Sequence, residues 1–206
     1  MSSELKTNKI SPATGTALTL ADSGDTLTLP SGATLDIASG ATITNSGSQS
    51  GFGKVLQVVS SSYNGSDSTT STTFVDTGLT ANITPSSTSN KVLILCDFTM
   101  GFGTNGRSGY CIKRGSTELN LGNATSIGNR KVVTTADYSA ENTVLGSGSI
   151  SYLDSPSSTS SVTYTLAMLS RDTAYSAWLN YTGYDGNNAS YVYRGASTIT
   201  LLEIAG

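Results

Sequence analysis

The chain has 206 residues, a formal net charge of −3 and no histidine, which excludes Ser-His-Asp and Cys-His catalysis and the usual zinc sites. Only 12% of the residues are charged, against about 25% in typical soluble domains, while there are 34 serines and 31 threonines. Low charge with recurring apolar runs favours an all-β protein over a disordered chain. It also argues against nucleic-acid binding, and no stretch approaches the roughly 18 apolar residues of a membrane helix.

Residues 1–12 are polar, end at Pro12 and contain no repeat. This composition is typical of a terminal arm, and we expect it to attach the protein to a partner. The start of the chain, Met1–Lys6, lacks the apolar run of a signal peptide. We therefore expect synthesis and assembly in the cytoplasm of the cell that makes the protein, without insertion into a membrane.

Residues 13–53 contain a short repeat and a linker. Four glycines, at steps of 9, 8 and 8 residues, each precede a short segment in which apolar and polar residues alternate. Such a strand presents its apolar side chains on one face, which so thin a segment cannot cover by itself. We expect other copies of the chain to bury it in an oligomeric β shaft. The residues predicted to mediate this oligomerisation are Leu18, Leu20, Leu27, Leu29, Leu35, Ile37 and Ile43.

Residues 54–206 contain longer strands separated by clusters of Ser, Asn and Gly. Lys91–Phe102 has apolar residues on both faces, which predicts a central strand packed on two sides for part of its length. Leu93 and Leu95 lie on one face, and the other face is predicted to hold Val92, Ile94, Cys96, Phe98 and Met100. Arg114-Gly115-Ser116 predicts a tight hairpin, and loops are expected at 146–149 and 155–158. About eight to ten strands without a helical period predict a jelly-roll-like β-sandwich head. The other predicted strands are 55–59, 110–113, 117–121, 150–153, 162–169, 174–181 and 199–204.

Motifs for cofactors and metals are weak. Gly101–Gly106 fits G-x-G-x-x-G, but a strand follows where a dinucleotide site needs a helix, so a turn is expected. Asp185–Asn188 lacks the later acidic ligands of a calcium loop and is interpreted as a hairpin turn. Cys96 and Cys111 are expected to be buried free thiols, although a disulfide between neighbouring strands stays open. We expect no metal and no cofactor.

Paired carboxylates could still hydrolyse a glycosidic bond. Asp137 with Glu141, or Asp154 with Asp172, could converge, but no spacing singles out either pair. Solvated loop acids are the usual explanation of such residues. We therefore expect no catalytic residue and no enzyme, with a polysaccharide depolymerase as the least favoured alternative.

One region has the composition of a sugar-binding site, because aromatic faces contact sugar rings while amides and carboxylates bond their hydroxyls. The competing interpretation is that these aromatics pack between sheets or between subunits, with Trp178 in the core. Within the region the contact residues are predicted to be Tyr184, Asp185, Asn187, Asn188 and Tyr191. The whole region comprises Tyr175, Trp178, Tyr181, Tyr184, Asp185, Asn187, Asn188, Tyr191, Tyr193 and Arg194.

The order of several segments resembles that of tail-fibre and related structural proteins of bacteriophages, especially phages of marine bacteria. The opening Ser3–Ile10 leads into Gly-x-Thr-Leu repeats, as is typical of that group. The later segments of the resemblance are 91–95, 113–117, 152–156 and 197–204. It implies a homotrimeric virion appendage whose N-terminal end binds the tail or another virion protein and whose head binds host polysaccharide or protein.

The leading hypothesis is thus a non-enzymatic virion fibre, with an attachment arm (1–12), a shaft and linker (13–53) and a head (54–206). A purely structural decoration or adaptor is the main alternative. The sequence leaves open the receptor, the attachment to tail or capsid, and the loops of the head that point outward.

Overall fold

The structure is a computed structural model that describes residues 54–125, 128–186 and 189–206, together with 26, 28–34, 36 and 38–39. The chain forms two compact units, Met1–Ser50 and Gly51–Gly206. In the first unit the described residues belong to no strand, and Leu29 is 52% exposed in the single chain. The oligomeric β shaft therefore stays a prediction. The arm 1–12 and the other proposed shaft residues lie outside the described residues, namely Leu18, Leu20, Leu27, Leu35, Ile37 and Ile43.

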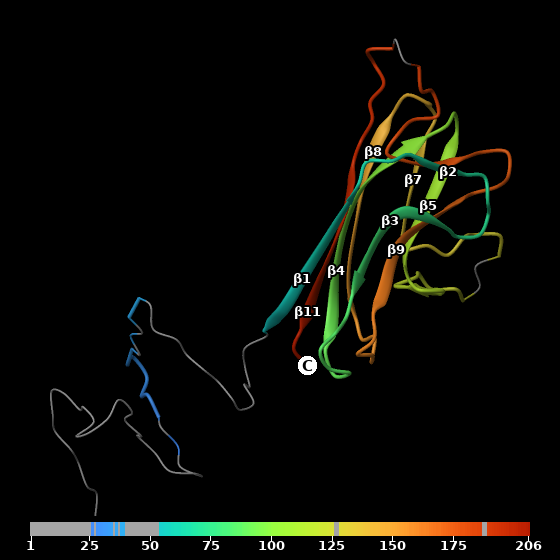
Figure 1. Cartoon of the computed structure of the whole chain (residues 1–206). Helices are drawn as coiled ribbons and strands as arrows, with labels where there is room; N and C mark the ends of the chain where they lie inside the picture. Colours follow the sequence, from blue (N-terminus) through green and yellow to red (C-terminus); the bar gives the residue numbers. More distant parts are fainter. Residues whose placement is uncertain are drawn as a thin grey trace, which may run out of the picture. The chain divides into compact units, whose positions relative to one another are not determined.

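The second unit consists of two antiparallel β-sheets, and its described residues contain no helix (Figure 1). The predicted all-β fold is confirmed, and the two sheets are those of a β-sandwich. The first sheet contains β1 (Val55–Tyr63), β2 (Asp67–Thr69), β4 (Lys91–Phe102), β8 (Leu145–Asp154), β10 (Ala177–Leu179) and β11 (Ser197–Ile204). The second contains β3 (Val75–Ile83), β5 (Gly106–Arg114), β6 (Thr117–Leu119), β7 (Thr135–Ser139) and β9 (Val162–Ser170).

The strand order of each sheet is set by which strands are hydrogen-bonded to each other. In the first sheet β1 pairs with β11, β11 with β4 and β4 with β8, while the short β10 extends the β11 edge of β4 and pairs with β2. In the second sheet β3 pairs with β9 and β9 with β5. The other edge of β5 is shared by β6 and β7. Apart from the β5–β6 hairpin, the paired strands of the sandwich are not consecutive in the sequence.

The core lies between the two sheets and follows the period-2 alternation of side chains. On β4 the inward residues are those predicted to share a face, and all are buried: Val92, Ile94, Cys96, Phe98 and Met100. Strands β5 and β9 supply Tyr110, Ile112, Tyr164, Leu166 and Met168 from the facing sheet. Cys96 and Cys111 are both buried and free.

The other face of β4 differs from the prediction. Leu93 is partly exposed and Leu95 is 39% exposed, so the described residues of the single chain do not pack this strand on two sides. The reason is architectural, because a sandwich of two layers covers each sheet on its inner face only. The apolar outer face of β4 is therefore available to another molecule.

The predicted loop at 146–149 is wrong, because these residues lie inside β8. Gly148 pairs with Phe98 on β4, and a Cβ atom at Gly148 would lie 2.5 Å from the Phe98 ring. A Cβ at Gly146 would likewise meet the Phe102 ring at 3.2 Å. The glycines thus allow a close approach of aromatic rings within a strand. The loop at 155–158 and the hairpin at Gly115, whose φ is 55°, agree with the prediction.

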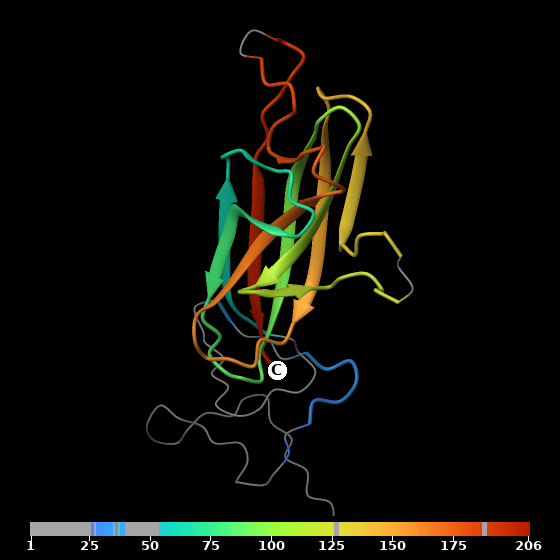
Figure 2. The same ribbon diagram turned by 90° about the vertical axis from the view of Figure 1, so that its right-hand side faces the viewer.

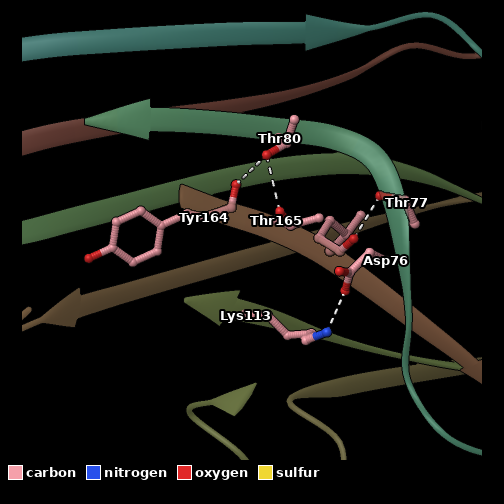
Figure 3. A network of polar contacts seen from close by, with 7 residues as sticks. Asp76, Thr77, Thr80, Lys113, Tyr164 and Thr165 are labelled. Carbon is pink, nitrogen blue, oxygen red and sulfur yellow. Dashed lines mark hydrogen bonds and ion pairs between the residues drawn. The ribbon is translucent and has the colours of Figure 1, made fainter. Parts of the chain in front are cut away.

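Strand β3, which the sequence did not predict, contains an irregularity held by side chains (Figure 3). Its pairing with β9 shifts between Asp76 and Thr80. Within this shift the Thr77 hydroxyl donates to the Leu166 carbonyl at 2.7 Å, and Thr80 bonds the hydroxyl of Thr165 at 3.0 Å. These side chains link β3 to β9 where the regular ladder is interrupted.

The sandwich has two distinct ends. We call the end with Lys54 the base, because Ala205 donates its amide to the Lys54 carbonyl at 2.9 Å and the chain terminates there. We call the opposite end the tip. It holds the described residues of the connection between β10 and β11, 180–186 and 189–196, which project beyond the strands in both views (Figures 1 and 2). Residues that enter the head and residues of the candidate sugar-binding region therefore lie at opposite ends.

Candidate functional site

The tip loop, residues 180–196, is fixed at its start by Asn180, which has a φ of 65° and is 1% exposed. Its Nδ2 donates to the carbonyls of Tyr63 and Gly65, each at 2.9 Å. Its Oδ1 accepts a hydrogen bond from the Ser197 hydroxyl at 2.6 Å. Asparagine tolerates the left-handed conformation better than most residues. One buried side chain therefore holds both ends of the loop against the β1–β2 turn.

The turn between β4 and β5 supports the same loop. The G-x-G-x-x-G segment spans the end of β4, a turn at Asn105 and the start of β5, so the predicted turn is confirmed. A Cβ at Gly101 would collide with the Tyr181 carbonyl, while Gly183 donates its amide to the Phe102 carbonyl at 2.9 Å. The glycines here allow two backbones to approach, which is a packing role.

Three tyrosines of the tip loop face solvent: Tyr184, Tyr191 and Tyr193 are 43%, 58% and 66% exposed. The rings of Tyr184 and Tyr191 are nearly parallel, with centroids 6.1 Å apart and planes at 8°. A hydrogen bond and the charge interaction with the Tyr184 phenol raise the pKa of the Tyr191 phenol above its ordinary value. The pair is a flat aromatic surface with hydrogen-bonding edges, the kind of surface that can stack on a sugar ring.

The charged residues of the loop pair with each other. The Arg194 guanidinium forms an ion pair with Asp185 and donates to the Ser66 hydroxyl at 2.9 Å. It also lies over the Tyr181 ring, 5.6 Å from its centroid. The predicted contact residues Tyr184, Asp185 and Tyr191 thus belong to one exposed loop. Asn187 and Asn188, which were predicted beside them, lie outside the described residues.

The expectation that Trp178 lies in the core is wrong. Its neighbours Ala177 and Leu179 are both fully buried in the core, so the alternation of β10 turns Trp178 to the other face of the sheet. There its ring meets Tyr181 edge-on, with centroids 4.7 Å apart. The tryptophan therefore belongs to the tip surface.

A polar cavity of about 260 Å³ lies beside Trp178. The indole N–H of Trp178 is buried and has no acceptor among the described residues. Buried donors without partners are rare, and a ligand hydroxyl could accept this hydrogen bond. No sequence pattern predicts this cavity, because its lining comes from distant segments: Gly103, Thr104, Asn142, Tyr175, Ser176 and Trp178.

The proposed acidic pair Asp154 and Asp172 does not converge. Asp154 lies near the base, where it accepts hydrogen bonds from Arg114 at 2.8 Å and from the Tyr164 hydroxyl at 2.7 Å. Asp172 follows the tip end of β9 and pairs with Arg171 at 2.8 Å. These two carboxylates therefore cannot flank one glycosidic bond.

Comparison with the models of known protein families and with curated proteins found no match for this chain. In the part of the chain that the structure describes, no helix is long and apolar enough to cross a membrane. The resemblance to phage tail fibres therefore stays a prediction.

Proposed function

We propose that the chain is a subunit of a homotrimeric bacteriophage virion fibre and that its sandwich is a head that binds the host surface, with glycan as the ligand. One observation carries this proposal. The exposed tyrosines, the unpaired Trp178 donor and the polar cavity gather at the tip, while the chain enters the sandwich at the base. In an intact particle, residues 1–12 would bind the tail or another virion protein.

The strand order supports a jelly-roll assignment for this head. In β1-β11-β4-β8 and in β3-β9-β5-β7, strands from the first half of the unit alternate with strands from the second half. This alternation results when one long antiparallel ribbon is rolled into two sheets. Jelly rolls occur in both viral and sugar-binding proteins, but the fold alone does not define a function.

The outer face of the first sheet supports the trimer. Val58, Leu202, Leu93 and Leu153 are direct partners across β1, β11, β4 and β8, and they form an apolar row on that face. Val58 is 59% exposed and Leu153 is 46% exposed. Contiguous exposed apolar residues on a soluble domain typically mark a protein interface. We assign this row to contacts with the other copies of the chain.

Light scattering of the full-length protein tests the assembly. We expect a trimer at micromolar concentration, and we expect Leu153→Ser to weaken it, because a polar hydroxyl replaces a large, exposed apolar side chain of the proposed interface. Ser151→Ala, on the same face of β8, is the control and should leave the mass unchanged. A monomeric wild-type chain, or a Leu153→Ser variant that assembles as well as wild type, would contradict the assignment.

Binding of the full-length protein to immobilised capsular polysaccharides and lipopolysaccharides of marine bacteria tests the receptor function. We expect Tyr191→Ala and Trp178→Phe to weaken binding about tenfold, since each removes an aromatic face or a donor at the tip. Lys91→Ala at the base is the matched control. Failure of the wild-type chain to bind any of these glycans or intact cells would favour a purely structural virion protein, and release of oligosaccharides would favour a depolymerase.

A further inference from the structure

A second cavity, of about 450 Å³, lies on the outer face of the second sheet, away from the apolar row. It is bounded by β5, the end of β9 and the segment between β6 and β7, residues 120–134 (yellow-green in Figure 1). We call it the basic pocket, after the four cationic residues in its lining: Arg107, Arg130, Lys131 and Arg171. The sequence did not single out these residues, because they are spread over three segments of the chain.

The basic pocket is built by the backbone, which fixes the 120–134 segment at both ends. Gly122 donates its amide to the Val133 carbonyl at 3.2 Å, and Thr134 donates to the Tyr110 carbonyl at 3.0 Å. The Val133 side chain packs directly on Gly109 of β5. A Cβ atom at Gly109 would lie 2.5 Å from Val133 Cγ1 and 3.1 Å from Leu169 Cδ1. Glycine at this position therefore lets the segment close over the sheet and form an apolar floor.

The basic pocket holds a large share of the cationic residues of the chain. Four of the 11 lysines and arginines line it, although the whole chain carries a net charge of −3. Among the described residues, the one carboxylate that pairs with Arg107, Lys131 or Arg171 is Asp172. Lys131 donates to the neutral Thr72 carbonyl at 3.1 Å, and it forms no ion pair within the described part of the chain. A cavity lined by one sign of charge raises the local concentration of counter-ions.

Aromatic rings orient two of the guanidinium groups. Arg107 lies over the Tyr138 ring, 4.5 Å from its centroid, and Arg171 lies over the Tyr175 ring at 4.0 Å. A guanidinium held face-on to a ring can offer the N–H groups at its edge, which match the geometry of carboxylate, sulfate and phosphate groups. Arg171 uses its Nε–H on Asp172, and the N–H groups at its far end remain for a ligand. The groups are thus positioned before a ligand arrives, which lowers the entropy cost of binding.

We propose that the basic pocket binds an acidic sugar of a polysaccharide, with Arg107, Arg171 and Lys131 on its anionic group and the floor of Val133 and Leu169 against its ring. This inference rests on the proposed function, since it names acidic polysaccharide as the ligand class of the head. It adds a site on the side of the head that is separate from the tip. The face opposite the apolar row stays open in a trimer that buries that row.

Affinity electrophoresis of the full-length protein, with polygalacturonate, dextran sulfate and neutral dextran in the gel, tests the proposal. We expect retardation by the acidic polymers and none by dextran, and the two acidic arms distinguish carboxylate from sulfate. The Arg107→Gln/Lys131→Gln variant should bind at least about tenfold more weakly, because it removes two cationic hydrogen-bond donors from the basic pocket. The Lys54→Gln/Lys91→Gln variant removes the same charge elsewhere and should bind as wild type does.

Equal losses in the two double variants would show a general charge effect and would overturn the proposal. So would the absence of binding to both acidic polymers, or equally tight binding to duplex DNA. The Tyr191→Ala variant changes the tip and leaves the basic pocket intact, so it separates this inference from the proposed function. If cells are bound through the tip while acidic polymers are not, the basic pocket alone is refuted. If acidic polymers are bound while no cell or bacterial glycan is, the receptor function alone is refuted.

Discussion

Replacing Glu203 by glutamine should destabilise the head in a pH-dependent way. Glu203 is 1% exposed, on the inward side of β11 near the base. It accepts hydrogen bonds from Gln57 Nε2 at 2.6 Å, from the Ser86 amide and hydroxyl, each at 2.7 Å, and from Asn90 Nδ2 at 2.5 Å. Burial alone would raise its pKa, but these donors more than offset burial and lower the pKa from 4.5 to about 2.

The contribution of Glu203 to the free energy of unfolding follows from the linkage between protonation and folding. A fall in pKa from 4.5 to about 2 corresponds to about 3 kcal/mol of stability at neutral pH. Because the folded pKa is below the unfolded one, this stability is fully present above about pH 4.5 and is lost as the pH falls towards 2. The amide side chain of glutamine would keep part of the hydrogen bonding. Its NH2 group is a donor, however, and cannot accept hydrogen bonds from donors such as Asn90 Nδ2. We therefore expect Glu203→Gln to lose about 1–3 kcal/mol at pH 7.

Urea unfolding at fixed protein concentration, followed by the fluorescence of the single tryptophan, measures this loss. The difference between wild type and Glu203→Gln should shrink as the pH is lowered from 4.5 towards 2. Glu141→Gln, which changes an exposed carboxylate, should stay within about 0.5 kcal/mol of wild type. A loss that is the same at pH 7 and pH 3, or a loss below 0.5 kcal/mol at pH 7, would refute the reasoning.

Three further predictions concern packing. Gly148→Ala should cost about 1–3 kcal/mol in urea unfolding, because the new methyl group meets the Phe98 ring; a neutral result would contradict the close approach. Asn180→Ala should cost about 2–4 kcal/mol, since it removes three hydrogen bonds at a left-handed residue, and Asn180→Gly should cost less. Burial raises the pKa of the Cys96 and Cys111 thiols to about 12, so neither should react with Ellman's reagent at pH 8 until urea unfolds the protein.

The sequence predicted the strands whose alternation is long and regular. The bounds of β4 agree at both ends, and β9 and β11 agree within two residues, because each presents a continuous apolar face to the core. Strand β3 was missed because its irregular pairing breaks the period between Asp76 and Thr80. The short β2 and β7 have few apolar residues and are defined by partners far along the chain. Such strands depend on tertiary pairing, which a local pattern does not contain.

The candidate site, like the strands, could be predicted from the sequence only in part. Composition was enough to find Tyr184 and Tyr191, because exposed aromatics near amides are visible in the sequence. The wrong placement of Trp178 came from judging a large apolar side chain by its type, whereas the three-residue β10 fixes its direction through Ala177 and Leu179. The cavities could not be predicted, since each is lined by segments that only the folded topology brings together.

The antiparallel pairing of β1 with β11 has a mechanical consequence. The tip loop leads directly into Ser197 at the tip end of β11, while Lys54 leads into β1 at the base. A pull between a tethered Lys54 and a ligand held by the loop would therefore draw the two strands past each other along their length. In this shear geometry the hydrogen bonds from Val58–Leu202 to Tyr63–Ser197 resist together, whereas peeling would break them one at a time. In the proposed fibre, this geometry would keep the head folded when a particle pulls on a bound cell.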